Sequence, residues 1–259
     1  MNNLEKLKNK IKNNVPIVGT HVSMSYPMIG EMLGLIGFDF VWIDMEHNPF
    51  SLEDVLGQII AIEGAGAAPL VRIPSIDPII VKRVLELVPA GIIFPNVRSR
   101  EEAELAVKSC LYPPKGIRGF GPGRASRYGL TDTARYIQDS ETATWKIIQI
   151  EHIEALDHLD EILAVEGVDT IVIGPNDLSG SIGLLGQTDH PNVKKLMDRI
   201  AEKARLAGIP FGVSMGYNPL VIREWIERGV SWIGAGSDIG YMFQQAMEAF
   251  KGTSELFDN

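Results

Sequence analysis

The stretch from residue 145 to residue 174, WKIIQIEHIEALDHLDEILAVEGVDTIVIG, decides how the whole sequence is interpreted. It begins with WKIIQIEH (145–152) and ends with VDTIVIG (168–174), two nearly continuous apolar runs of the kind found in parallel strands buried on both faces. Residues with helical spacing separate the two runs. The stretch therefore predicts one strand–helix–strand unit with parallel strands.

The same alternation extends from residue 15 almost to the end of the chain and yields eight strand–helix pairs. Eight repeats without a compositional break or flexible linker predict an α/β protein, a single-domain (β/α)8 TIM barrel over residues 1–259. A doubly wound open sheet is the alternative. The predicted strands are VPIVGTHVS (15–23), FDFVWIDM (38–45), APLVRIP (68–74), AGIIFPNV (90–97), WKIIQIEH (145–152), VDTIVIG (168–174), IPFGVSM (209–215) and VSWIGAGS (230–237).

Capping signals predict where several of the intervening helices begin. Ser51 is an N-cap candidate with Asp54 in the first turn, and Ser99 with Glu102 matches a capping box. Asp77 precedes a proline at the first helical position. These local signals agree with the barrel prediction.

Composition and charge exclude several classes of protein. The 45% hydrophobic residues and 26 glycines supply a core and many turns, which argues against disorder. The 24 Lys and Arg against 33 Asp and Glu give a formal net charge of −9, which repels a phosphate backbone. We therefore expect no nucleic-acid partner.

The cysteine count and the apolar runs predict a cytoplasmic protein. Cys110 is the single cysteine, which excludes a scaffold of internal disulfides and suits a reducing compartment. The first fourteen residues, MNNLEKLKNKIKNN, lack the apolar stretch of a signal peptide. No segment approaches the roughly 20 apolar residues of a membrane span, so we expect no membrane association.

One connection, over residues 111–144, is far longer than the roughly 2–6 residues usual between a strand and a helix. Two interpretations stay open and can both hold: a surface excursion that packs on a neighbouring subunit, or a lid or rim for an anionic substrate, with Arg124 as the substrate contact. The arginines of this connection are Arg118, Arg124, Arg127 and Arg135.

In such barrels the reacting groups gather at the C-terminal ends of the strands, where this sequence has two acidic residues after neighbouring strands. Glu151 and Asp177 would face one axial pocket with no lysine between them. Two like charges there raise at least one pKa unless a cation offsets them. A hard divalent ion such as Mg²⁺ or Mn²⁺ is the predicted solution, although Asp177 alone also fits a plain helix cap.

Two further predicted strands carry charged or titratable side chains that can take part in catalysis or binding. Asp44 stands three residues before His47, a spacing at which a turn can bring carboxylate and imidazole within hydrogen-bond reach. The alternative is that His47 caps the turn before Pro49. Arg72 lies inside an apolar strand and needs an anion, either in a structural ion pair with Asp44 or Glu46 or as a substrate oxyanion.

The strand ends offer no lysine for a Schiff base, because Lys146 stands at a strand start. This leaves metal-assisted enolisation as the predicted chemistry. His21 lies at another strand end, and its role stays open.

The same residues carry a resemblance to a known family. Over nearly its whole length the chain resembles the metal-dependent class II pyruvate aldolases of the HpcH/HpaI type, which include 4-hydroxy-2-oxoheptanedioate and 2-keto-3-deoxy sugar acid aldolases. The motifs stand in the family's order and spacing. They are Asp44-x-Glu46-His47, Val71-Arg72, YPPKGIRGFGPGRASRYG (112–129), Gln149-Ile150-Glu151 and GPNDLSGSIG (174–183).

The resemblance implies a carbon–carbon lyase of aromatic or sugar acid catabolism, which reversibly cleaves a 4-hydroxy-2-oxo acid to pyruvate and an aldehyde through a pyruvate enolate. It implies that Glu151 and Asp177 bind Mg²⁺, Mn²⁺ or Co²⁺, that Gln149 positions the bound pyruvate, and that no organic cofactor is needed.

The resemblance also implies roles for the remaining site residues. His47, supported by Asp44, would manage protons, and Arg72 would stabilise the enolate oxygen and the carbonyl under attack. Backbone amides and one hydroxyl would hold the pyruvate carboxylate. These groups lie around Gly174, Pro175 and Asn176, with Ser214 as the hydroxyl.

For assembly, the resemblance implies a homohexamer that exchanges the last helix between subunits, with the long loop reaching a neighbour's site. The apolar segment YMFQQAMEAF (241–250) suits such an exchange. Some relatives supply an acidic residue to the neighbouring site where this chain has Glu86, and several carry a tryptophan where it has Gly19-Thr20-His21.

Two other functions stay open. One is a related enolate enzyme on the same scaffold, either an acyl-CoA or malate lyase or an oxaloacetate-decarboxylating synthase. The other is a non-catalytic barrel that serves binding or assembly.

Overall fold

The computed structural model describes residues 3–257, and in it eight parallel strands pair in chain order and close into a barrel. The predicted (β/α)8 barrel is confirmed, and the open-sheet alternative is wrong. All eight predicted strands overlap observed ones. The strands are β1 (Ile17–Val22), β2 (Phe40–Asp44), β3 (Ala68–Arg72), β4 (Gly91–Phe94), β5 (Trp145–Ile150), β6 (Thr170–Ile173), β7 (Phe211–Met215) and β8 (Trp232–Ser237).

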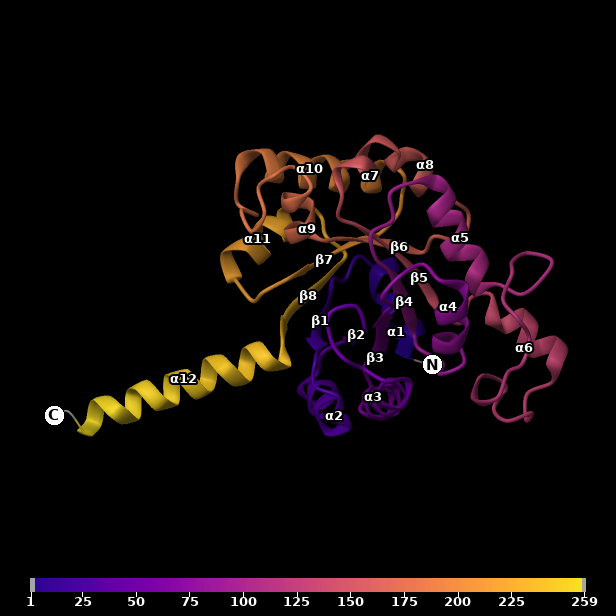
Figure 1. Cartoon of the computed structure of the whole chain (residues 1–259), viewed down its shortest axis with the longest axis horizontal. Helices are drawn as coiled ribbons and strands as arrows, with labels where there is room; N and C mark the ends of the chain where they lie inside the picture. The colour runs from indigo at the N-terminus through magenta and orange to yellow at the C-terminus, as the bar shows by residue number, and fades with distance from the viewer. Residues whose placement is uncertain (1–2, 258–259) are drawn as a thin grey trace.

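Helices surround this barrel, as Figure 1 shows. Most follow the strands as the barrel pattern requires, while α1 precedes β1. In residues 3–257 the α-helices are α1 (Asn3–Lys12), α2 (Pro27–Ile36), α3 (Leu52–Gly64), α4 (Pro78–Leu85), α5 (Arg100–Cys110), α6 (Thr133–Ser140), α7 (Ile153–Asp157), α8 (Leu159–Leu163), α9 (Pro175–Gly180), α10 (Pro191–Leu206), α11 (Pro219–Glu227) and α12 (Asp238–Phe257).

The predicted caps begin three of these helices. Ser51 and Asp54 form a reciprocal capping box at α3, and the Asp77 side chain accepts the Ile79 N–H at α4. At α5 the Ser99 side chain accepts the N–H three residues on, but the Glu102 carboxylate accepts the N–H of Arg98 at 2.6 Å instead of closing the box.

The barrel lumen is filled by apolar side chains and closed at its N-terminal end by α1. Leu4 and Leu7 of α1 are buried in the same cluster as the lumen residues of the strands. Within it, Phe40 and Trp232 pack edge to face with ring centroids 5.5 Å apart. Since side chains fill the lumen and α1 closes its N-terminal end, the lumen opens at the C-terminal end of the strands, where sites lie in such barrels.

The long connection over residues 111–144 leads from α5 to β5 and therefore lies at the N-terminal end of the barrel. It contains α6 and extends beside the barrel at the right of Figure 1. Arg118 contacts Glu86 at 2.8 Å, and the Arg124 side chain donates to the Leu87 carbonyl at 2.6 Å. These partners follow α4 and lead into β4, so they lie at the same N-terminal end.

Helix α12 extends away from the barrel, as the yellow helix in Figure 1 shows. Its apolar side chains are largely uncovered: Met242, Phe243 and Phe250 are 58%, 63% and 73% exposed. None of the helices in residues 3–257 has the length and apolar character needed to cross a membrane.

Candidate active site

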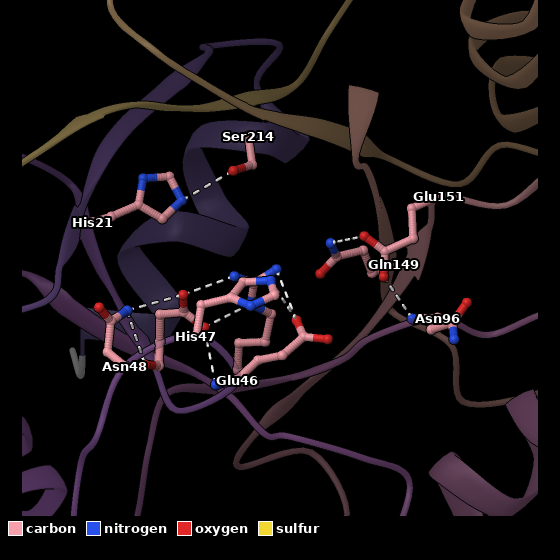
Figure 2. Close-up of polar contacts among 10 residues, drawn as sticks. His21, Glu46, His47, Asn48, Asn96, Gln149, Glu151 and Ser214 are labelled. Atoms are coloured by element: carbon pink, nitrogen blue, oxygen red, sulfur yellow. Dashed lines mark hydrogen bonds and ion pairs between the residues drawn. The ribbon is translucent and has the colours of Figure 1, made fainter. Parts of the chain in front are cut away.

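Polar side chains gather where the strands end at the open end of the barrel, as Figure 2 shows. Successive strand residues alternate between lumen and helices, so Asp44 follows Phe40 and Trp42 on the lumen face of β2. The β2–β3 register pairs Asp44 with Arg72, and both side chains are buried. Gln149 on β5 pairs with Val172 of the lumen cluster.

Arg72 is held by two carboxylates and a ring. Its Nε and Nη2 donate to Oδ1 and Oδ2 of Asp44, each at 2.8 Å, and its Nη1 lies 3.0 Å from Glu46 Oε2. The guanidinium carbon is 5.2 Å from the centroid of the Trp42 ring. The structure therefore forms the ion pair that the sequence left as an alternative, and it does so with both acids. A contact with a substrate oxyanion stays a prediction.

Asp44 is saturated with donors. Besides Arg72 it accepts the Glu46 N–H and the Asn48 side-chain amide, both at 3.1 Å. Burial alone raises its pKa, but the hydrogen bonds and charge of Arg72 outweigh burial and hold the pKa below the ordinary 3.8. The Asp44 carboxylate is therefore a fixed anion that orients the guanidinium.

His47 stands at the mouth of the site with 63% of its side chain exposed, and its Nε2 lies 3.6 Å from Glu46 Oε2. The predicted hydrogen bond between Asp44 and His47 is not among the contacts of residues 3–257. His47 is thus free to meet a ligand from the solvent side, with Glu46 rather than Asp44 beside it.

Glu151, just past β5, is almost fully buried and receives two donors. The Asn96 N–H donates to Oε1 at 2.7 Å, and the Gln149 amide donates to Oε2 (Figure 2). Burial raises the pKa of Glu151 to about 7, and the charges of Glu46 and Asp177 add to that rise against the opposing Asn96 hydrogen bond.

Asp177 lies in the first turn of α9 and is exposed. Within residues 3–257 its carboxylate has no hydrogen bond or ion pair. Its charge raises the pKa of both Glu151 and Glu46, although burial is the larger cause for each. The three carboxylates form a concentration of negative charge that Arg72 offsets in part, since its charge lowers the pKa of Glu46 and Glu151.

The residues present fit a divalent cation. Gln149 Oε1 is buried and has no hydrogen-bond partner among the described residues. A Cβ at Gly174 would lie 2.7 Å from Glu151 Oε2, so only glycine leaves room for that carboxylate. Two carboxylates and an orphaned amide oxygen are the ligands that hard cations such as Mg²⁺ and Mn²⁺ prefer.

This donor set is smaller than a cage made of protein side chains alone. Residues 3–257 contain no group of three or more His, Cys, Asp or Glu side chains arranged to hold a metal ion. A cation between Glu151 and Asp177 would therefore take its remaining ligands from Gln149, water or substrate, as Mg²⁺ commonly does.

Of the predicted donors to the pyruvate carboxylate, one backbone N–H is available. The Gly174 N–H donates to the Ile150 carbonyl at 3.1 Å, and Pro175 has no N–H. The Asn176 N–H lies in the first turn of α9, where helical N–H groups have no partner within the helix.

Ser214 pairs with His21, whose role the sequence left open. Ser214 Oγ is 3.0 Å from His21 Nε2 (Figure 2), and His21 Nδ1 is 2.8 Å from the Gly236 carbonyl. Because a carbonyl only accepts, Nδ1 carries the proton and Nε2 accepts from the Ser214 hydroxyl. Burial lowers the pKa of His21, which keeps the ring neutral.

Two cavities open at this end of the barrel. One, of about 310 Å³, is lined by Glu46, His47, Glu151 and Asp177, together with residues that sequence reasoning missed. The other, of about 260 Å³, is lined by Ser214, Pro175 and Asn176 with residues of α10 and α11. The missed residues of the first cavity include Asn96, Arg98 and His152.

Asn96 and Arg98 follow β4 in the motif PNVR (95–98). The sequence signal that points to them is their position, because they stand at a strand end like the predicted site residues. Arg124, by contrast, contacts the Leu87 carbonyl and Glu63 at the opposite end of the barrel. In its own chain Arg124 therefore does not join the site, and a contact with a neighbour's substrate stays a prediction.

Comparisons with known proteins agree with this architecture. The family model HpcH/HpaI aldolase/citrate lyase matches residues 18–243. A 5-keto-4-deoxy-D-glucarate aldolase from Escherichia coli O9:H4 (strain HS) is 37% identical over 237 residues, which is 91% of each chain.

Two solved structures share the whole fold. An HpcH/HpaI aldolase from Desulfitobacterium hafniense DCB-2 has a TM-score of 0.90 at 29% identity and covers 96% of each chain. The citrate synthase SbnG has a TM-score of 0.88 at 29% identity, covering 98% of this chain and 99% of its own. The chain belongs to the HpcH/HpaI aldolase/citrate lyase family.

Proposed function

We propose that this protein is a divalent-metal-dependent class II aldolase that reversibly cleaves a 4-hydroxy-2-oxo acid to pyruvate and an aldehyde. The carrying observation is that the carboxylates of Glu151 and Asp177 line one cavity at the C-terminal end of the barrel, while Gln149 Oε1 is buried with no partner among the described residues. Membership of the family and the 37% identical sugar acid aldolase support the reaction class.

The reaction needs a base, a place for an electron pair and a proton donor. In cleavage, a base takes the proton of the 4-hydroxyl, the C3–C4 bond breaks, and its electron pair moves toward the 2-oxo oxygen. The aldehyde leaves, and C3 then takes a proton to give pyruvate, so no oxidant or reductant is consumed. A divalent ion, when bound to Glu151 and Asp177, supplies positive charge beside the oxygen that becomes negative.

The other residues take their roles from their surroundings. His47 is the proposed proton carrier, because it is the exposed imidazole at the cavity mouth. Arg72 is proposed to stabilise the enolate oxygen and the carbonyl under attack, and Asp44 acts by fixing the guanidinium. The Asn176 N–H is the proposed donor to the pyruvate carboxylate, because the Ser214 hydroxyl is engaged with His21.

We extend the proposal to the setting of the enzyme. The relative's named substrate, 5-keto-4-deoxy-D-glucarate, is a sugar-derived keto acid, which favours sugar acid over aromatic catabolism. The uncovered apolar side chains of α12 support a homohexamer with exchanged C-terminal helices. The single, buried Cys110 suits a cytoplasmic location.

A second candidate is an enzyme that condenses the same enolate with another acceptor. The likeness to the citrate synthase SbnG favours it, because that protein shares the fold and 29% of its residues with this chain. Both candidates need the same enolate-forming residues and differ only in the acceptor, so an acceptor panel separates them.

Deuterium exchange into the methyl group of pyruvate tests the proposal without knowledge of the aldehyde. Proton NMR should show exchange with Mg²⁺, Mn²⁺ or Co²⁺ and loss of exchange with excess chelator. Glu151→Gln and Asp177→Asn should each lose exchange, while Glu161→Gln, an exposed change on α8, should retain it. Exchange at full rate in chelator would contradict the metal-dependent mechanism.

A further inference from the structure

We propose that Arg98 is the specificity-determining residue for the aldehyde half of the substrate and that it selects aldehydes carrying a carboxylate. The proposal rests on the aldolase function above and deepens it, because it assigns a subsite for the part of the substrate that is not pyruvate.

Arg98 shares a cavity with the proposed metal ligands. It lines the 310 Å³ cavity together with Glu151 and Asp177, which places a guanidinium beside the position proposed for pyruvate. The pyruvate half would occupy the buried end at Glu151. The aldehyde half would then extend toward the mouth of the same cavity, where His47 and the 38% exposed Arg98 side chain stand.

Asn96 links Arg98 to the proposed metal ligand Glu151 through hydrogen bonds to both. The Asn96 N–H donates to Glu151 Oε1 at 2.7 Å, and Asn96 Oδ1 accepts from Arg98 Nε at 3.0 Å. Asn96 has φ 54°, a left-handed conformation that asparagine tolerates better than most residues. Because one residue holds both side chains, the guanidinium has a defined position relative to the carboxylate.

Arg98 keeps hydrogen-bonding capacity for a ligand. Its Nη1 contacts Glu154 Oε2 at 3.2 Å, in a pair whose glutamate side chain is 61% exposed. Within residues 3–257 its Nη2 has no partner. An exposed pair of this kind contributes little stability, so a carboxylate ligand can replace Glu154 at small cost. The planar guanidinium suits a carboxylate.

The acidic lining of the cavity favours a cation beside an anionic aldehyde group. Glu46, Glu151 and Asp177 line the same cavity and would repel a negatively charged group that lacked a cation near it. The arginines of residues 111–144 do not reach this end of the barrel in the same chain. Arg98 is the only arginine among the described residues that line the cavity.

Two matched pairs of aldehydes test the proposal. Glyoxylate with glycolaldehyde, and succinate semialdehyde with 4-hydroxybutanal, differ within each pair by a carboxylate against a hydroxymethyl group. Aldol addition to pyruvate should favour the carboxylate member in the wild type. Arg98→Gln should lower the ratio of kcat/KM for the two members about tenfold in the longer pair or both pairs, the size of one charge-assisted hydrogen bond.

The ratio distinguishes a change in aldehyde specificity from a general loss of activity. Misfolding or loss of pyruvate binding lowers kcat/KM for both aldehydes of a pair together and leaves their ratio unchanged. Arg98→Lys should fall between wild type and Arg98→Gln, and Glu154→Gln should raise the ratio by freeing the guanidinium. Arg100→Gln, the same charge change at a residue paired with Glu104 outside this cavity, is the matched control and should keep the wild-type ratio.

A wild-type ratio in Arg98→Gln, or equal losses in Arg98→Gln and Arg100→Gln, would overturn the proposal. Deuterium exchange into pyruvate by the wild type separates failure of the proposed aldehyde subsite from failure of the proposed aldolase function. If exchange occurs and the ratio does not move, the aldehyde subsite is wrong while the aldolase function stands. If the wild type catalyses neither exchange nor aldol addition, the proposed function itself fails.

Discussion

Asp44 and Arg72 form the contact on which the geometry of the site depends most. Two hydrogen bonds of 2.8 Å to Asp44 fix the guanidinium of Arg72, and Glu46 contacts its remaining nitrogen, Nη1. A buried arginine that loses one acid keeps a desolvated charge, and this costs more than the pair itself contributes. The pair therefore links the stability of the barrel to the shape of its site.

Asp44→Asn should lower the free energy of unfolding by about 2 kcal/mol at pH 7, less than for an isolated buried pair because Glu46 still pairs with Arg72. The folded-state pKa of Asp44 lies below its ordinary 3.8, so its stabilisation is present at neutral pH. That stabilisation is lost as the pH falls below about 4 and through the folded pKa. Urea unfolding at pH 7 and pH 3 measures the change.

Asp139→Asn is the control for that measurement, because Asp139 pairs with Arg135 at 3.4 Å on the exposed surface of α6. It should leave the unfolding curve unchanged at both pH values. A difference between wild type and Asp44→Asn that is as large at pH 3 as at pH 7 would contradict the role given to the Asp44 charge.

At the scale of single residues, the sequence predicts which side chains belong to the site better than it predicts which of them contact each other. The acids, Arg72 and Gln149 could be selected because they interrupt or end apolar strands, and parallel register places Asp44 beside Arg72. The partner of His47 could not be predicted, because a turn offers several acids within three residues. Arg98 was missed because an arginine after a strand reads as an ordinary exposed residue unless its cavity is known.

Among the elements, α12 is the least covered, because beyond Tyr241, which packs against the barrel core, its large apolar side chains are mostly exposed in the described chain. Met242 and Phe243 are more than half exposed, and burying side chains of this size stabilises an interface by about 1.5–3 kcal/mol each. A second copy of the chain that exchanges this helix would cover them.

Met242→Glu combined with Phe243→Glu should dissociate the proposed hexamer, because two charges would enter an apolar interface. Sedimentation velocity should show the mass of six chains for the wild type and a smaller species for the variant. Gln244→Glu with Gln245→Glu adds the same charge to the polar side of α12 and should keep the wild-type mass. A monomeric wild type, or an assembly that the double variant leaves intact, would contradict the exchange.

The elements also show where local signals suffice. Side-chain caps at Ser51, Asp77 and Ser99 begin helices as predicted, because the cap satisfies N–H groups within four residues. The length of the connection over residues 111–144 identifies it in the sequence as an unusual segment, but does not predict the helix α6 within it. Its position at the N-terminal end follows from topology, since a segment between α5 and β5 lies opposite the ends that carry the site.

For the whole molecule, repetition made the barrel predictable. Eight apolar runs with helices between them can close only in a few ways, and each strand needs the same burial on both faces. The division of the site into two cavities was not predictable, because it depends on how far the side chains of α9, α10 and α11 reach over the strand ends. Such distances are set by packing across the whole barrel.

The site also depends on the whole barrel for its charge balance. Glu46, Glu151 and Asp177 come from three separate strand ends, and the fold brings them together without an equal number of cations. The raised pKa of Glu151, about 7, reflects its burial and this excess charge. A divalent ion bound between Glu151 and Asp177 would offset this excess charge.

Manganese binding measured by electron paramagnetic resonance tests the proposed metal site most directly. Titration of the metal-free wild type should show one Mn²⁺ per chain, and Glu151→Gln and Asp177→Asn should each weaken binding by at least about 10–100-fold. Glu161→Gln should bind as the wild type does. Binding of Mn²⁺ with unchanged affinity in both site variants would contradict the account.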